Sequence, residues 1–318
     1  MDEEKFLEQY ENVKRNFSRR QIKEKFLEQY ENGKRDFSGI DLRKCYFYDA
    51  LLMDLNLSGA NLENALIEGH IGNTNLSGAN LKKASLRHTY FIGTNLSYAN
   101  LSGANLICAD FTNSDLTGAN LSGANLDETK FIGSNLRNAN LTDIKIPRDP
   151  IVHYSTRPDG KLIVNSSRGL DAKKLLSRYA AGERNFEKVI LHGVDLSGAE
   201  LRDVNLFCAH LSNCNLSNAT LSGDWDAAKF INCDFRGARL RFCELNSASF
   251  IYVDMREATI CADTTCTNFI EVNFQGAELR CSGESDSFFH NVTLKDGFFL
   301  QGSSNYPVRP NKNIEKLL

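Results

Sequence analysis

The sequence predicts an all-β solenoid, a chain wound into a coil that turns a corner at every repeat. Leu or Phe returns every fifth residue, fourteen times without a miss, from Leu76 to Leu141. A period of five fits neither the 3.6 residues of a helical turn nor the alternation of a strand. The residue two places earlier is nearly always small: Ala79, Ala99, Ala104, Ser114, Ala119, Ala124 and Ala139. One large and one small inward position per repeat suit such a coil.

The repeats resemble those of the pentapeptide-repeat family, whose motif is Ala, then Asn or Asp, then Leu, followed by two freer positions. Two clear copies are Ala99–Gly103 and Ala119–Gly123. The resemblance implies a right-handed quadrilateral β-helix with four repeats to a coil, so that residues twenty apart lie one above another. The sequence supports this independently, because Phe91, Phe111 and Phe131 are spaced by twenty. We therefore expect their rings to occupy one side of the square.

A second and looser repeat block begins at Phe186. Its register slips by one residue at Trp225, which we expect to point inward in the shortened repeat, and two similar slips lie within 67–71 and 260–269. Cys or Val often replaces Ala at the small position. With each slip counted as one repeat, the phenylalanines of this block again share one face: Phe230, Phe250, Phe269 and Phe289.

Each repeat block follows a segment that predicts a capping helix. Residues 26–37 and 175–186 match position for position, and a third copy occupies 6–17. The second of these helices is expected near 171–181, with Gly182 ending it. An amphipathic helix there covers the apolar end of the first coil. The predicted organisation is a helical N-terminal cap (1–36), a first β-helix (37–146), a linker with a hairpin-like excursion and a capping helix (147–185), a second β-helix (186–300) and a C-terminal tail (301–318).

Asparagine commonly precedes the large residue of a repeat, about once per coil. We expect these side chains to form a vertical file whose amides hydrogen-bond from coil to coil at the strand spacing of roughly 4.8 Å. A structural role is favoured over a ladder that binds a ligand. The members of the file are Asn61, Asn80, Asn100, Asn120 and Asn140.

Composition and motifs argue against an enzyme. The six histidines show no metal-ligand spacing, and no glycine pattern suits a phosphate. The nine cysteines include no Cys-x-x-Cys pair. We expect Cys214 and Cys233 to stack on adjacent coils as thiols, with a disulfide as the alternative. We therefore predict no catalytic, metal or cofactor-binding residues and no cofactor.

Charge and hydropathy indicate the compartment and exclude some partners. The net charge of −3 and the pI near 6.1 give no basic surface for nucleic acid. The first 36 residues contain no apolar run, so we expect neither a secretory signal nor a membrane span. The sequence therefore predicts a cytoplasmic protein that binds neither nucleic acid nor membrane.

The residue after each stacked phenylalanine is expected to point outward, and it is often isoleucine. A contiguous apolar strip on a soluble rod usually marks a contact. Two interpretations remain open: a protein partner binds the strip, or the 147–185 segment or the other rod covers it. The candidate strip consists of Ile92, Ile132, Ile231, Ile251 and Ile270, with Tyr252 beside it.

The predicted function is a protein–protein interaction scaffold with an unknown protein partner. The resemblance also suggests an alternative, a DNA mimic that inhibits a topoisomerase, as certain family members are. Charge disfavours it, because the 76–141 block holds four acidic and five basic side chains. The aromatic pairs near the end favour a capped last coil, with a homodimer through the C-terminal end as the alternative. The joint at 175–186 looks like those of cyanobacterial members.

Overall fold

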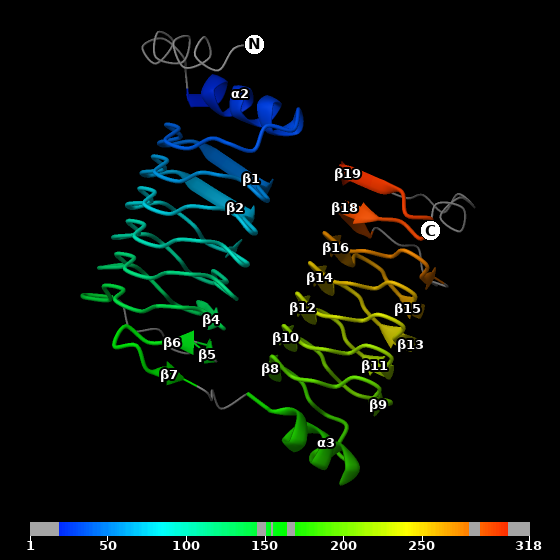
Figure 1. Ribbon diagram of the computed structural model, residues 1–318. Coiled ribbons are helices and arrows are strands. Elements are labelled where there is room, and N and C mark those ends of the chain that lie inside the picture. Colours follow the sequence, from blue (N-terminus) through cyan, green and yellow to red (C-terminus); the bar gives the residue numbers. More distant parts are fainter. Residues whose placement is uncertain (1–18, 145–150, 154, 164–168, 280–286, 305–318) are drawn as a thin grey trace. The chain divides into compact units, whose positions relative to one another are not determined.

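The computed structural model describes residues 19–144, 151–153, 155–163, 169–279 and 287–304. The chain divides into two compact units, Met1–Val164 and Asn165–Leu318. Figure 1 shows each unit as a stack of short coils with a helix at its first coil. Among the described residues, no helix is both long and apolar enough to cross a membrane.

In the first unit the coils are joined mostly by single parallel bridges rather than by long strands. The amide of Leu81 donates to the carbonyl of Asn100 (2.7 Å), and the amide of Leu101 donates to that of Asn120 (2.7 Å). Each residue thus bonds to the coil four repeats further on, which confirms the predicted solenoid with four repeats to a coil. The elements are α2 (Arg19–Glu31), β1 (Tyr46–Leu51), β2 (Leu66–His70), β3 (Thr89–Tyr90), β4 (Lys130–Ile132), β5 (Ile151–His153), β6 (Ser155–Thr156) and β7 (Leu162–Ile163).

The second unit has longer strands, which form two sheets on its walls. One sheet has the order β19-β18-β16-β14-β12-β10-β8 and the other β17-β15-β13-β11-β9. All neighbours are parallel except β18 and β19, which form an antiparallel pair after the last coil. The elements are α3 (Ala172–Ala180), β8 (Ile190–His192), β9 (Glu200–Leu201), β10 (His210–Ser212), β11 (Thr220–Asp224), β12 (Lys229–Ile231), β13 (Arg239–Glu244), β14 (Ser249–Ile251), β15 (Thr259–Asp263), β16 (Asn268–Ile270), β17 (Glu278–Leu279), β18 (Phe288–Thr293) and β19 (Phe299–Ser304).

The asparagine file forms as the sequence predicts. Within a repeat, Asn100 Oδ1 accepts a hydrogen bond from the amide of Ser102 (3.1 Å), and Gly103 then takes the left-handed conformation that turns the corner (φ 67°). Between coils, Asn80 Nδ2 donates to Asn61 Oδ1 (3.2 Å), and Asn100 Nδ2 donates to Asn80 Oδ1 (3.5 Å). The file therefore fixes both the corners and the stacking of the coils.

Two of the one-residue slips occur beside a glycine. Trp225, at the first of them, is fully buried in the core of its unit. Just before it, Gly223 lies so close to the coil below that a β-carbon would stand 2.3 Å from the carbonyl oxygen of Val204. At the earlier slip, a β-carbon on Gly69 would stand 2.4 Å from the carbonyl oxygen of Ala50. A shortened coil brings two backbones together, and only glycine fits there.

The helix predicted before the second block is α3. Its N-cap is Asp171, whose carboxylate accepts a hydrogen bond from the amide of Lys174 (2.7 Å). The helix ends before Gly182, which takes a positive φ of 96°. Leu175 is buried in the core of the second unit, as Phe26 of α2 is in the first. Both helices therefore cover the apolar end of a coil.

A tyrosine hydroxyl completes each cap. The hydroxyl of Tyr30 accepts a hydrogen bond from the amide of Met53 (3.1 Å), and that of Tyr179 from the amide of Arg202 (2.9 Å). Both amides belong to the first coil, where no earlier coil offers a carbonyl. A guanidinium lies over each ring at these centroid distances: Arg35 over Tyr30, 4.4 Å, and Arg184 over Tyr179, 3.9 Å.

The structure extends the first unit into the segment predicted as a linker. β5 pairs in parallel with β4, so that Val152 continues the column of Phe131. The predicted hairpin-like excursion is the antiparallel pair β6–β7. At the other end, β19 continues to Ser304, four residues into the predicted tail. The third copy of the capping segment, at 6–17, and the C-terminal end beyond Ser304 lie outside the described residues.

Candidate interaction surface

The inward positions form one aromatic column in each unit. The rings of Phe91 and Phe111 stack with centroids 4.8 Å apart and planes within 4° of parallel. In the second unit, the rings of Phe230 and Phe250 stack at 4.7 Å and 9°. The remaining stacked pairs are Phe111–Phe131 (5.3 Å), Phe250–Phe269 (5.4 Å) and Phe269–Phe289 (5.2 Å). With the large side chains directed inward, the neighbouring residues of each repeat form the walls.

The candidate isoleucine strip is buried rather than exposed. Its members are 0–2% exposed, yet none of them belongs to the hydrophobic core cluster of its own unit. Tyr252 is half-buried and takes a left-handed conformation (φ 56°). Both interpretations of the strip, a bound protein partner and a cover from this chain, stay predictions. The residues concerned are Ile92, Ile132, Ile231, Ile251 and Ile270.

Large aromatic side chains that sequence reasoning passed over are exposed on the walls. Phe242 is 83% exposed and Tyr98 is 72% exposed, and both occupy left-handed corner positions. Tyr48 (64%) and Tyr46 (56%) lie on β1 on either side of a buried phenylalanine. The signal was present in the repeat, because the second residue after the inward Leu is an outward corner position usually filled by Gly, Asn or Asp.

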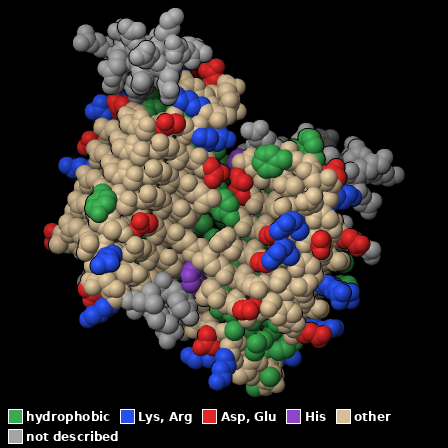
Figure 2. Space-filling view, viewed as in Figure 1, with side chains coloured by type: hydrophobic (Ala, Val, Ile, Leu, Met, Phe, Trp, Pro, Cys, Tyr) green, Lys and Arg blue, Asp and Glu red, His purple; other side chains and the backbone are tan. Residues whose placement is uncertain are grey.

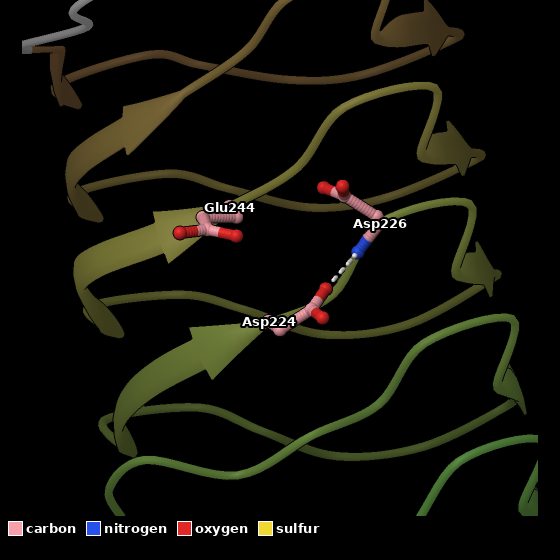
Figure 3. A group of neighbouring side chains, drawn as sticks. All are labelled: Asp224, Asp226 and Glu244. Atoms are coloured by element: carbon pink, nitrogen blue, oxygen red, sulfur yellow. Dashed lines mark hydrogen bonds between the residues drawn. The ribbon is translucent and has the colours of Figure 1, made fainter.

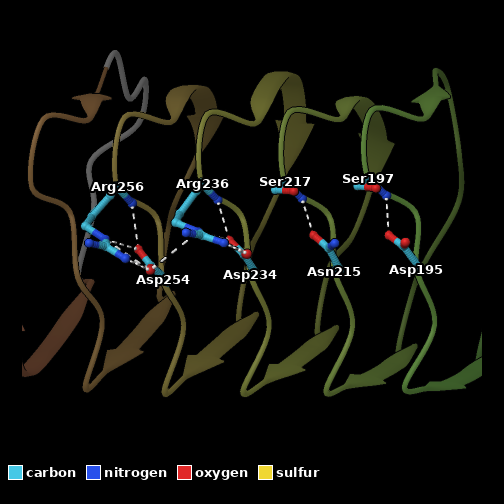
Figure 4. A network of polar contacts seen from close by, with 8 residues as sticks. All are labelled: Asp195, Ser197, Asn215, Ser217, Asp234, Arg236, Asp254 and Arg256. Atoms are coloured by element: carbon cyan, nitrogen blue, oxygen red, sulfur yellow. Dashed lines mark hydrogen bonds and ion pairs between the residues drawn. The ribbon is translucent and has the colours of Figure 1, made fainter.

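One wall of the second unit carries a ladder of acidic and basic side chains (Figure 4). Arg236 and Arg256 each donate to the aspartate two residues before them (Nη2 to Oδ2, 2.6 Å in both cases). Arg236 also approaches Asp254 of the next coil (3.9 Å). The hydrogen bonds from the Arg236 side chain lower the pKa of Asp234. Asp234 and Asp254 on this wall are therefore paired with arginines.

Three carboxylates gather where β11 and β13 end (Figure 3). Ligand atoms of Asp224, Asp226 and Glu244 all lie within 4.8 Å of one another. Asp224 Oδ1 accepts from the amide of Asp226 (3.0 Å), and Asp226 Oδ1 accepts from the amide of Asn246 (2.8 Å). Two of the three carboxylates thus already stabilise the corners of their coils.

The buried cysteines are core side chains. The eight described cysteines are free thiols. Cys214 and Cys233 each direct the thiol at backbone carbonyls, with Sγ to Leu211 O at 3.6 Å for Cys233. Burial raises the pKa of the Cys233 thiol well above its ordinary value and raises that of Cys243 to about 12. A thiol held protonated in this way is a poor nucleophile.

The repeats decide the family. The family model of the pentapeptide repeat region matches residues 70–141, and that of pentapeptide repeats in eight copies matches residues 36–69, 185–223 and 226–260. Together these segments cover more than half of the chain. The chain belongs to the pentapeptide-repeat family. No curated protein sequence matches it significantly.

Several solved pentapeptide-repeat structures resemble this member of the family. HetL, which is involved in heterocyst differentiation regulation in the cyanobacterium Nostoc sp. strain PCC 7120, is 23% identical over 86% of this chain and 98% of its own (TM-score 0.29). Full-length QnrB1, a plasmid-mediated fluoroquinolone resistance protein, is 19% identical over 69% and 91% (TM-score 0.24). A protein of the Arabidopsis thaliana thylakoid lumen is 30% identical over 36% and 70% (TM-score 0.25).

Proposed function

We propose that this pentapeptide-repeat protein is a non-enzymatic scaffold that binds other proteins through the flat walls of its coils. The repeat fixes the inward residues and the corners, and it leaves the remaining outward side chains free to vary from coil to coil. Such a wall offers a long and rigid contact surface. Rigid contact residues lose little conformational entropy when a partner binds.

The observation that carries this proposal is the set of exposed aromatic side chains. Phe242 and Tyr98 take no part in a core, and each occupies a corner conformation that a bulky residue adopts with strain. Aromatic side chains dominate the binding energy of protein interfaces. Residues that expose large rings at strained positions fit a binding role better than a packing role.

Charge separates this proposal from the alternative of a DNA mimic. A mimic needs walls of uniform negative charge. In Figure 2, Lys and Arg side chains are interspersed with Asp and Glu on the visible face. Two of the aspartates in Figure 4, Asp234 and Asp254, are likewise paired with arginines. A supercoiling assay with DNA gyrase decides between the two, because a mimic inhibits the enzyme and a scaffold leaves it unaffected.

The scaffold role is tested by capture from cells of the source organism. The bait is the full chain, and the variant carries Tyr46→Ser, Tyr48→Ser, Tyr98→Asn and Phe242→Asn. We expect the variant to keep its circular dichroism spectrum and unfolding midpoint and to lose specific partners. An identical set of captured proteins from both baits would contradict the proposal.

We further propose a cytoplasmic location. Free thiols persist in a reducing compartment, and four described cysteines fill buried apolar slots as thiols: Cys45, Cys214, Cys233 and Cys243. Cell fractionation followed by immunoblotting tests the location, and recovery in a secreted or membrane fraction would contradict it.

A further inference from the structure

Phe242 stands on the wall formed by β9, β11, β13, β15 and β17, at a bulge in the middle strand of that sheet. The register shifts between Arg241 and Cys243, so Phe242 is the extra residue of β13. Gly223 on β11 and Ala262 on β15 are both in register with the buried Cys243, so Phe242 itself has no partner on either neighbouring strand. Its ring is 83% exposed.

This position costs the fold stability. The backbone of Phe242 is left-handed (φ 56°), a conformation that suits Gly or Asn and strains a bulky residue. The corresponding corner of β9 has Asp203, with a similar φ of 57°. Replacing Phe242 with Asn therefore relieves strain and removes no core contact. An exposed ring at a strained position that adds no core contact points to a role other than stabilising the fold.

Two arginines flank the ring on one side. Arg239 and Arg241 are exposed and lie on the same side of β13, two residues apart. The neighbours of Arg239 in the sheet are Thr220 and Thr259, which carry no charge. Within the described part of the chain, neither guanidinium forms a salt bridge. Both are available for carboxylates.

The other side of the ring is acidic. Glu244 is in register with Asp224 on β11 and with Asp263 on β15, so three carboxylates form a column at the end of the strands. Glu244 lies two residues from Phe242, about 7 Å along a strand. This is within the Debye length of about 8 Å at physiological ionic strength. A polyanion such as a nucleic acid bound at the arginines is therefore repelled by the column.

We propose that Arg239, Arg241, Phe242 and Glu244, the β13 site, bind an extended segment of a partner protein. The segment carries carboxylates opposite the two arginines, an apolar side chain against Phe242 and a basic side chain opposite Glu244. The site spans five residue steps, about 17 Å in an extended strand. It matches a short peptide in length and in charge order. This inference rests on the proposed scaffold function and names the chemistry of its partner.

The test uses a phage-displayed library of random 12-residue peptides, panned against the full chain. Peptides that bind are then measured by fluorescence anisotropy against Phe242→Asn and against a double variant, Arg239→Glu with Arg241→Glu. Tyr98→Asn is the matched control, because Tyr98 is an exposed aromatic at a left-handed corner of the first unit. A single-stranded 20-mer DNA serves as the competing probe.

We expect enriched peptides to combine acidic, apolar and basic residues in that order or its reverse. Their affinity falls at least tenfold with Phe242→Asn and with the arginine pair, stays within twofold with Tyr98→Asn and weakens at 0.5 M salt. The unfolding midpoint of Phe242→Asn equals or exceeds that of the wild type.

Three results would overturn the β13 site. They are peptides that bind equally to Phe242→Asn, DNA that binds through Phe242, and a lower unfolding midpoint for Phe242→Asn, which assigns the ring a structural role. If peptides bind elsewhere on the chain, the site fails and the scaffold function stands. If cellular capture also fails, the scaffold function fails with it.

Discussion

The two units begin with the same cap but place their aromatic columns on different walls. Counted from the cap, the column of the first unit stands above Leu52, the fourth repeat of the coil, and that of the second unit above Leu191, the second repeat. Tyr30 and Tyr179 nevertheless bind their first coils in the same way. The cap therefore starts a solenoid without choosing which wall holds the rings.

The small residues beside the columns differ as well. In the first unit, Ser134 Oγ donates to the carbonyl of Phe111 (2.7 Å). In the second unit, the equivalent slot holds the thiol of Cys233, with Sγ 3.6 Å from the carbonyl of Leu211, and then Val253. The slot therefore selects for size, and a hydrogen bond there is optional.

The largest expected effect is the loss of a stacked ring. Phe111→Ala and Phe250→Ala each remove a fully buried side chain from the middle of a column, so we expect each to lower the free energy of unfolding by about 3–5 kcal/mol. Chemical denaturation followed by circular dichroism measures both. If the free energy of unfolding falls far less in one variant than in the other, the two columns do not stabilise their units equally.

The capping tyrosines give a smaller and unequal effect. Tyr30→Phe leaves the part-buried amide of Met53 without its acceptor, and we expect the free energy of unfolding to fall by about 1–3 kcal/mol. Tyr179→Phe leaves the exposed amide of Arg202, which water can satisfy, so the loss is about 1 kcal/mol or less. Equal losses in denaturant titrations would contradict the difference in burial.

Exchanges at the small slot test whether size alone matters. Ser134→Ala removes one hydroxyl hydrogen bond, and we expect it to lower the free energy of unfolding by about 0.5–1.5 kcal/mol. Cys233→Ser places in the second unit the residue that the first unit uses, and we expect a change of about 1 kcal/mol or less. A loss of several kcal/mol for Cys233→Ser in the same denaturation assay would show that the second slot requires a thiol.

The smallest effect is the pH dependence of the charged ladder, which the asparagine-rich wall of the first unit lacks. The pKa of Asp234 is lowered in the folded state, so its contribution is present above the unfolded value of about 3.9 and is lost as pH falls through the folded value. Asp234→Asn keeps an acceptor for the corner, as Asn215 does one coil earlier. We expect it to cost less than about 1 kcal/mol at pH 7.

The difference in stability between the Asp234→Asn variant and the wild type should shrink as pH falls below the unfolded pKa of about 3.9. Denaturation at a series of pH values from 7 downward checks this, with Arg236→Gln as the control that removes the partner of the same carboxylate. A difference that stays constant as pH falls would mean that the charge is not its cause.

The five-residue repeat, together with the family that it resembles, predicted most of the fold. The repeat determines which side chains point inward and led to the stacked rings and the inward Trp225, whereas the helix signals before Gly182 led to α3. The repeat did not predict that β5 continues the first unit, because the segment before β5 has no repeat and two prolines. It also left open what covers the isoleucine strip, since the cover of a wall is not encoded in the wall's own period.

The candidate site was harder to predict for the same reason. The corner position of Phe242 is usually filled by Gly, Asn or Asp in this repeat, so the sequence marks Phe242 as unusual without saying whether its ring is covered. Its 83% exposure becomes visible only when the coils are stacked.

Trp225 is the single tryptophan of the chain, and it lies fully buried in the second unit. Its indole emission therefore reports on one half of the molecule only. Circular dichroism averages over both halves. A scan that records the two signals together assigns each unfolding step to its own half without labels, truncation or added dyes.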